Sequence, residues 1–265
     1  MDATHLGNEL IELHDHPRQV SPFSARYPGL TAQTGYAAAR QLHASRLAKG
    51  WKLEGRKIGF TNRTLWDRYG VHEPMWGAVY DRTLVFAAGN KAVVPLAGLV
   101  QPRIEPEICF RLKARPPVTR DPLALLGCIE WIAHSVEIVQ CHHPEWKVTL
   151  ADCTADNGLH GKLVLGTPVP VERISGLAAA LPFLKVDLFK GDERKDQGIG
   201  SNVLGSPLLA LAFLVEILSK QNQVLEPGEI ISTGTLTDAH PVAPGEVWRT
   251  DFHGFAVRGM EITFE

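Results

Sequence analysis

Two glutamates stand two positions apart inside an apolar run, and this spacing strongly constrains how the chain can fold. Glu105 and Glu107 are flanked by apolar residues at positions 99–100, 104 and 108–110. In a β-strand, residues i and i+2 project from the same face, so one strand would carry both carboxylates to the same place. Pro106 lies between them and cannot donate a ladder hydrogen bond, which predicts a strand edge or a bulge at this point.

Buried carboxylates repel one another and lose their hydration, so they require a positive partner. Oxygen ligands suit Mg²⁺, Mn²⁺ or Ca²⁺. The same spacing also fits the polar face of an edge strand. Glu137 favours the metal interpretation, because it stands between Val136 and Ile138 in a second apolar run, where a further free carboxylate is strongly disfavoured. The sequence therefore predicts a divalent-metal site formed by Glu105, Glu107 and Glu137.

Composition excludes several classes of protein. The chain has 265 residues, of which 45% are hydrophobic, enough for a substantial core. No apolar run is long enough to span a membrane, and no basic stripe indicates nucleic acid. The first twenty residues lack the pattern of a signal peptide. The four cysteines form no CxxC motif, which is typical of reduced thiols and predicts a cytoplasmic protein.

The pattern along the chain predicts a β-rich α+β fold with a helical N-terminal part. The predicted helices are residues 1–16, a helix capped by Thr31 and ended by Gly50, a turn at 64–69, and residues 206–221. Residues 122–136 are interpreted as a helix that runs into the strand holding Glu137. Residues 142–161 lack periodicity and are interpreted as a long functional loop.

Several segments, in order, are similar to one known family. The chain resembles the 2-hydroxypentadienoate (2-keto-4-pentenoate) hydratases and 4-oxalocrotonate decarboxylases, which belong to the fumarylacetoacetate hydrolase superfamily. The matching segments are 27–31, 55–61, 101–107, 135–139, 146–147, 155–157, 164–166, 203–205 and 227–234.

The resemblance implies a β-roll catalytic core with a helical N-terminal region, divided here into residues 1–85 and 86–265. It implies Mg²⁺ or Mn²⁺ on the three glutamates, a small 2-oxo acid substrate, and a homo-oligomer, with a complex with a related lyase as an alternative. The implied reaction is hydration of a 2-hydroxy-2,4-dienoate to a 4-hydroxy-2-oxo acid in aromatic catabolism. The alternatives are decarboxylation of a 4-oxalocrotonate-type acid, C–C hydrolysis of an acylpyruvate, and a partner chain that has lost activity.

The resemblance also places Lys57 in the active site, whereas composition alone favours a surface lysine. Lys57 is the candidate for proton transfer, and a dry cleft beside a cation predicts a lowered pKa for its ammonium group. Thr61 and Asn62 are candidates for binding the substrate carboxylate; turn chemistry is the alternative.

Asp156, Asn157 and His160 lie in the predicted long loop. Asp156 is a candidate for orienting water or the metal shell, and Asn157 for binding substrate, with an Asx-turn as the alternative for both. His160 is a candidate acid–base group, because its ordinary pKa is near neutral.

The other histidines give weaker signals. Adjacent residues in an extended segment point in opposite directions, so His142 and His143 are not expected to share a zinc ion. His14 and His16, near the N-terminus, are expected to face solvent or to be flexible.

Met75 is a departure from the family pattern. The family usually carries an aspartate before an aromatic residue and a glycine, and this chain has Met75, Trp76 and Gly77 there. An acidic group for proton transfer is therefore missing, and His72 or Glu73 is expected to substitute, or the enzyme acts on another 2-oxo acid. Met75 also makes that wall apolar, which indicates a larger or less charged substrate tail.

Overall fold

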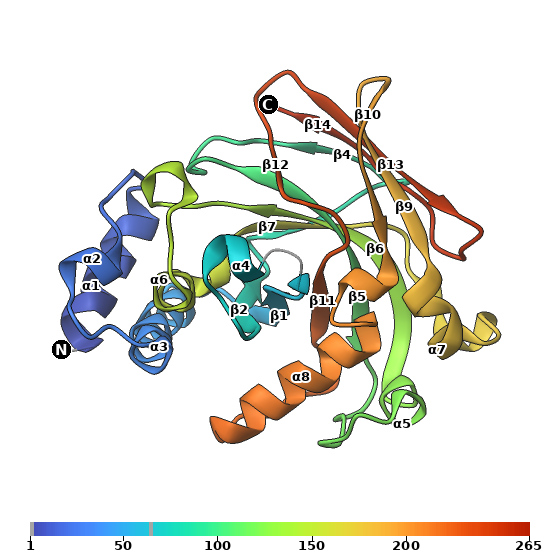
Figure 1. The fold of residues 1–265 in the computed structure, drawn as a ribbon, viewed down its shortest axis with the longest axis horizontal. Coiled ribbons are helices and arrows are strands. Elements are labelled where there is room, and N and C mark those ends of the chain that lie inside the picture. The colour runs from blue at the N-terminus through green and yellow to red at the C-terminus, as the bar shows by residue number, and fades with distance from the viewer. Residues whose placement is uncertain (1–2, 64–65) are drawn as a thin grey trace.

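The computed structural model describes residues 3–63 and 66–265, and it consists of two curved sheets with helices at their flanks (Figure 1). The helices are α1 (Ala3–Asp15), α2 (Phe23–Arg26), α3 (Ala32–Ala48), α4 (Trp66–Tyr69), α5 (Pro122–Leu126), α6 (Leu150–Ala155), α7 (Leu177–Ala180) and α8 (Pro207–Lys220). The strands are β1 (Leu53–Gly59), β2 (Met75–Tyr80), β3 (Leu84–Phe86), β4 (Lys91–Val94), β5 (Arg103–Leu112), β6 (Ile129–Val139), β7 (His160–Leu165), β8 (Val169–Pro170), β9 (Lys185–Lys190), β10 (Glu193–Ile199), β11 (Ile230–Thr235), β12 (His240–Pro241), β13 (Val247–His253) and β14 (Glu261–Phe264).

The larger sheet has nine strands, and its main path runs β2-β1-β11-β5-β6-β7-β3. The smaller sheet runs β10-β9-β13-β14-β4. Strands β1 and β2 precede residue 85 but pair within the same sheet as β5 and β6. The division at residue 85 stays a prediction.

The two faces of β5 have different surroundings. Ile104 packs with residues of β9, β13 and β14 from the smaller sheet, and Ile108 and Phe110 pack with α8. Glu105 and Glu107 project from the opposite face, as their spacing predicts. The apolar face is therefore covered by α8 and the second sheet, and the other face is left for the site.

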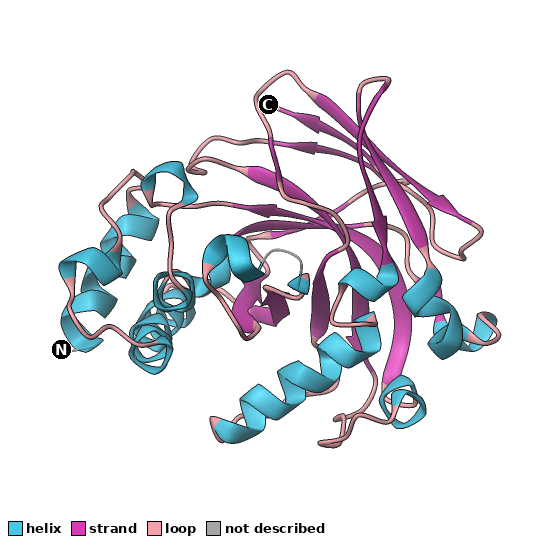
Figure 2. Cartoon of the chain, viewed as in Figure 1, coloured by secondary structure: helices cyan, strands magenta, loops and turns pink. Residues whose placement is uncertain are grey.

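Helices α1, α2 and α3 form a separate layer at one end of the molecule (Figure 2). Leu6, Leu10 and Leu13 of α1 are buried against Phe23 and Ala38. The predicted N-terminal helix is confirmed as α1. The predicted cap Thr31 is confirmed as well, because its side chain accepts from Thr34 N at 3.2 Å. The structure adds a second cap, Ser206, at the start of α8.

Two predicted elements are wrong. Helix α5 covers only 122–126, and β6 begins at Ile129, because Gly127 ends the helix and the following residues are rich in β-branched and aromatic side chains. The predicted loop 142–161 contains α6, whose capping box joins Thr149 and Asp152. In the predicted turn 64–69, residues 64 and 65 lie outside the described part, and α4 covers the remainder.

Pro106 does not lie at a sheet edge, since β5 pairs with β11 on one side and β6 on the other. The expected irregularity is present in the neighbouring strand, where the register of β11 shifts between Ser232 and Thr235. The missing N–H of Pro106 is therefore accommodated by a bulge in the partner strand. Among the described helices, none is long and apolar enough to cross a membrane.

Candidate active site

The three glutamates predicted from spacing meet on one face of the larger sheet. Glu105 in β5 is directly opposite Glu137 in β6, and Glu107 is opposite Ser135. One carboxylate oxygen from each of the three lies within 4.8 Å of the others. Glu107 and Glu137 are fully buried, and Glu105 is half-buried. Like charges placed directly opposite in a sheet are destabilising, so this arrangement needs a positive partner.

The pKa values of the three glutamates reflect the excess of negative charge in this cluster. Burial raises the pKa of Glu105 to about 7, with the Lys57 ammonium opposing this and Glu137 adding to it. Burial and repulsion from the other two carboxylates raise the pKa of Glu107 well above its ordinary range. For Glu137, burial is outweighed by Lys57 and His160, and the pKa is lowered. Two of the three groups therefore resist ionisation in the absence of a cation.

Lys57 of β1 reaches the same cluster, with Nζ 3.0 Å from Glu137 Oε2. Its side chain is buried, which alone would lower its pKa. The attraction of Glu137, Glu105 and Glu107 outweighs burial and raises the pKa. For the protein groups alone the pKa is therefore raised, because three carboxylates stabilise the ammonium form. The lowering expected beside a bound cation stays a prediction.

Neighbouring groups fix the orientation of two carboxylates. His160 Nδ1 lies 2.8 Å from Glu137 Oε1, and His160 Nε2 lies 2.9 Å from Thr83 Oγ1. Because an ionised carboxylate only accepts, Nδ1 carries the proton, and burial lowers the pKa of the ring. His160 thus lies where it can orient Glu137, with Thr83 behind it.

Glu107 is held through one oxygen. Ser232 Oγ donates to Glu107 Oε2 at 2.6 Å, and Gly234 N donates to the same atom at 2.9 Å. Glu107 Oε1 is buried and has no hydrogen-bond partner. An orphaned carboxylate oxygen beside two further carboxylates fits a hard divalent cation, whose preferred ligands are oxygens.

A cavity of about 70 Å³ opens beside the cluster. Lys57, Thr61, Asn62 and Glu105 line it, as does Arg103. Thr61 Oγ1 is buried without a hydrogen-bond partner, and Asn62 forms a β-bridge with Val203. An apolar wall faces these polar groups, formed by Met75, Val139, Trp146, Val148 and Leu159.

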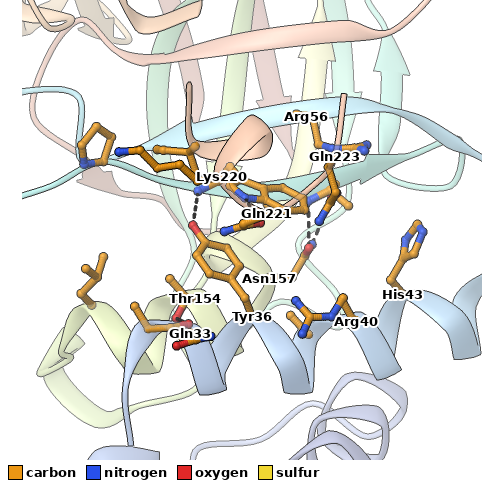
Figure 3. Close-up of a pocket in the computed structure, with 18 of the residues that line it drawn as sticks. Gln33, Tyr36, Arg40, His43, Arg56, Thr154, Asn157, Lys220, Gln221 and Gln223 are labelled. Atoms are coloured by element: carbon orange, nitrogen blue, oxygen red, sulfur yellow. Dashed lines mark hydrogen bonds between the residues drawn. The ribbon is translucent and has the colours of Figure 1, made fainter. Parts of the chain in front are cut away.

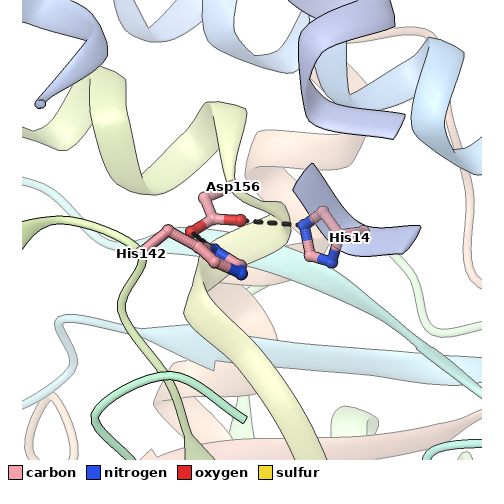
Figure 4. Close-up of side chains that lie close together, drawn as sticks. All are labelled: His14, His142 and Asp156. Atoms are coloured by element: carbon pink, nitrogen blue, oxygen red, sulfur yellow. Dashed lines mark hydrogen bonds and ion pairs between the residues drawn. The ribbon is translucent and has the colours of Figure 1, made fainter. Parts of the chain in front are cut away.

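Asp156 and Asn157 do not line this cavity, and Asn157 lines a second cavity described below. Asp156 accepts from His14 and His142 (Figure 4). It is not part of the cluster of three glutamates. The Asn157 side chain bonds both Ala78 N, at 2.9 Å, and Ala78 O, at 3.0 Å. The amide of Asn157 therefore holds β2 in place, and its predicted role in substrate binding stays untested.

His14 does not face solvent as expected, because its side chain is only 6% exposed and bonds Asp156 at 2.8 Å. His16 is exposed.

A second group of side chains could offer ligand atoms to a metal ion, since atoms of His14, His142 and Asp156 lie within 4.8 Å of one another. These atoms are already used in hydrogen bonds: both Asp156 oxygens accept from the two histidines, and Arg46 Nη2 donates to His14 Nδ1 at 3.0 Å. This group is a hydrogen-bond network. His143 bonds Val20 O instead, so the adjacent histidines have different partners.

A second, larger cavity of about 800 Å³ lies on the other face of β1 and β2 (Figure 3). It is lined by Arg56 of β1 and Trp76 of β2. These residues are next to Lys57 and Met75 along the strands and so point to the opposite face. Glu73 also lines it and is exposed, as is His72. Neither residue lines the cavity beside the glutamates, so the expected substitution for the missing aspartate is not supported by their positions.

No family model matches the chain. A 2-hydroxyhexa-2,4-dienoate hydratase from Comamonas testosteroni is 31% identical over 260 residues, covering 97% of this chain and 96% of that relative. A 4-oxalocrotonate decarboxylase from a Pseudomonas species is 31% identical over 218 residues, covering 82% of this chain and 81% of that one. The chain belongs to the 2-keto-4-pentenoate hydratase and 4-oxalocrotonate decarboxylase family.

The fold of this family member agrees with a solved relative. The 4-oxalocrotonate decarboxylase from Pseudomonas putida G7, complexed with magnesium and adipate, superposes with a TM-score of 0.90 at 24% identity. The match covers 99% of this chain and 97% of that one. The predicted fumarylacetoacetate hydrolase-like α+β fold is confirmed.

Several residues that line the cavity beside the glutamates, or that hold the glutamates, were not predicted as site residues. Arg103 shares the face of Glu105 by the same i, i+2 rule, so this signal was available. Ser232 and Gly234 lie in the matching segment 227–234, but their function depends on the pairing of β11 with β5. Trp146 lies in the matching segment 146–147, and Asp238 lines the cavity without any local sequence signal.

Proposed function

We propose that the protein is a divalent-metal-dependent lyase that hydrates a 2-hydroxy-2,4-dienoate to a 4-hydroxy-2-oxo acid. The observation that carries this proposal is the cluster of Glu105, Glu107 and Glu137, with Lys57 Nζ 3.0 Å from one oxygen of Glu137. Membership of the hydratase and decarboxylase family supports it.

The three glutamates would hold Mg²⁺ or Mn²⁺. When bound, such an ion would polarise the C2 oxygen of a 2-oxo acid and stabilise negative charge at that atom. Charge complementarity supports this, because three carboxylates against one ammonium leave an excess of negative charge. The solved relatives that share this fold are described with magnesium, calcium or manganese.

Lys57 would hold and transfer the proton at Nζ. Its raised pKa makes the ammonium the form that meets substrate in the metal-free site, which suits a proton donor. The positive charge of a bound cation would act in the opposite direction and ease its deprotonation. Thr61 would bind the substrate carboxylate, since its hydroxyl lines the cavity and has no partner among the described residues.

The apolar wall suits an uncharged substrate tail. Met75, Val139 and Leu159 are buried there. A five- or six-carbon dienoate would place its hydrocarbon end against this wall and gain about 25 cal/mol for each Å² of apolar surface buried. The Comamonas testosteroni relative is named for a six-carbon dienoate, which supports the same substrate class.

The second candidate is decarboxylation of a 4-oxalocrotonate-type dicarboxylate, and Arg103 is the observation that favours it. Its guanidinium lies 4.3 Å above the Trp146 ring and lines the cavity. A guanidinium can pair with a second carboxylate on the substrate. Release of CO₂ would identify this reaction.

The test uses metal-stripped protein to which Mg²⁺ is restored. Loss of dienoate ultraviolet absorbance with formation of the 4-hydroxy-2-oxo acid is expected, and 4-oxalocrotonate is assayed in parallel. Glu107→Ala is the control, because it removes the carboxylate with the orphaned oxygen. Unchanged absorbance with both Mg²⁺ and Mn²⁺ would refute the proposal.

We also propose a cytoplasmic homo-oligomer, with assembly with a related lyase as the alternative. Four free cysteines support a reducing compartment. Large exposed apolar side chains, including Phe86, Leu123 and Phe183, support subunit contacts. Size-exclusion chromatography with light scattering tests the oligomer.

A further inference from the structure

We infer that His14, on the N-terminal helix α1, is a positioning residue of the active site. Through Asp156 it holds the turn η3 (Asn157–Leu159) against the side chain of Lys57. This inference rests on the proposed function for its kinetic consequence, but its structural consequence can be measured without substrate.

The turn has an unusual backbone. Asn157, Gly158 and Leu159 have φ values of 49°, 67° and 61°, three left-handed residues in succession. Residues other than glycine rarely adopt this region. Such a conformation persists only where its surroundings fix it firmly, and segments of this kind concentrate at functional sites.

The turn forms the wall behind Lys57. A Cβ added to Gly158 would lie 3.3 Å from Lys57 Cδ and 3.1 Å from Gly77 N, so backbone and lysine are closely packed. Gly158 and Leu159 line the small cavity. A displacement of this turn would therefore move the lysine stem and the wall that faces the substrate.

Asp156 anchors the start of the turn. Its backbone O accepts from Leu159 N at 2.9 Å, and its carboxylate accepts from His142 Nδ1 at 2.7 Å and His14 Nε2 at 2.8 Å. Arginine can only donate, so His14 Nδ1 accepts from Arg46 and His14 Nε2 carries the proton given to Asp156. The direction of every hydrogen bond in this network is thus determined.

The contribution of His14 is separable from the packing of its helix. Helix α1 is held by Leu6, Leu10 and Leu13, which pack in an apolar cluster with Phe23, Ala38 and Ala155, and His14 is not part of this cluster. Figure 4 shows His14 reaching Asp156 from a helix separate from the segments that carry Asp156 and His142. Replacing the imidazole removes one anchor of the turn and leaves the apolar face of α1 intact.

The variants are His14→Ala, His14→Gln and, as the matched control, the exposed His16→Ala. The amide nitrogen of glutamine can occupy the place of His14 Nε2 and donate to Asp156. For dienoate hydration with saturating Mg²⁺, we expect His14→Ala to lower kcat by 10- to 100-fold with a smaller change in KM. We expect His14→Gln to restore most of the rate and His16→Ala to match the unchanged protein.

Hydrogen exchange supplies a readout that needs no substrate. The amide of Leu159 donates to Asp156 O, and the amide of Gln140 donates to Leu159 O. Of the three variants, only His14→Ala should make these two amides exchange faster. Mg²⁺ affinity by calorimetry should remain unchanged. Unaltered exchange and kcat in His14→Ala would overturn the inference, and so would equal losses in His14→Ala and His14→Gln. Absence of turnover in every form, with exchange faster only in His14→Ala, would refute the proposed function and retain the positioning role.

Discussion

The two opposed glutamates of the site should have opposite effects on stability when each is neutralised in metal-free protein. We consider Glu105→Gln and Glu137→Gln, which change one carboxylate to an amide of nearly the same shape. Glu105 and Glu137 are cross-strand neighbours. They differ in pKa. Lys57 and His160 lie beside Glu137 and lower its pKa, whereas burial raises the pKa of Glu105 to about 7.

The magnitude for Glu105 follows from linkage. Its folded-state pKa of about 7 exceeds the ordinary 4.5, so its ionisation costs stability as the pH rises through this interval. At about 1.4 kcal/mol for each pH unit, Glu105→Gln should raise the free energy of unfolding by up to about 3 kcal/mol at pH 8. This is an upper limit, because Glu105 is half-buried and partly screened by solvent. Near pH 4.5 the gain should vanish.

Glu137→Gln has the opposite sign. The pKa of Glu137 is lowered, so its ionised form stabilises the fold, and its loss leaves the Lys57 ammonium without its partner. Breaking a buried ion pair in this way typically costs about 3 to 5 kcal/mol.

Urea unfolding followed by tryptophan fluorescence, in EDTA at pH 8 and pH 5, measures both variants. Adding Mg²⁺ at about 100 times its Kd should stabilise the unchanged protein by about 2.7 kcal/mol. The same addition should stabilise neither variant. The reasoning would be refuted if both variants shifted the unfolding free energy in the same direction at pH 8, or if Glu105→Gln showed no dependence on pH.

Three further predictions follow from other contacts. Ser232→Ala removes the hydroxyl that donates to Glu107 Oε2, and calorimetry should show Mg²⁺ affinity weakened by about tenfold; equal affinity would contradict this role. Gly234→Ala should lower the midpoint of thermal unfolding, because Gly234 has φ 102° and an added Cβ would collide with Thr61; an unchanged midpoint would contradict this. Burial lowers the pKa of His134 from 6.5 to about 4, so the folded state favours the neutral ring. As the pH falls from 6.5 to 4, the free energy of unfolding should therefore decrease by about 3 kcal/mol. His134→Gln should remove much of this decrease, which urea unfolding at each pH would measure.

Features set by local chemistry were predictable from the sequence. The alternation of a strand places Glu105 and Glu107 on one face, and apolar flanks indicate that Glu137 is buried. The cap Thr31 depends on a few neighbouring residues, and it was predicted correctly.

Features set by distant contacts were not predictable in this way. The pKa of Lys57 depends on three carboxylates from two other strands, and their combined charge outweighs the effect of burial. His14 is hydrogen-bonded to Asp156, a residue 142 positions away, so the sequence near His14 gives no signal. The length of α5 was overestimated because apolar runs fit a helix or a strand until Gly127 and the strand pairing decide between them.

The most direct test of the central claim is a titration of Mg²⁺ into metal-free protein while dienoate absorbance is followed. The account predicts no turnover in EDTA, saturable turnover as Mg²⁺ is added, and no recovery in Glu107→Ala at any Mg²⁺ concentration that saturates the unchanged protein. Turnover that persists in EDTA, or that Glu107→Ala retains, would contradict a metal site formed by these three glutamates.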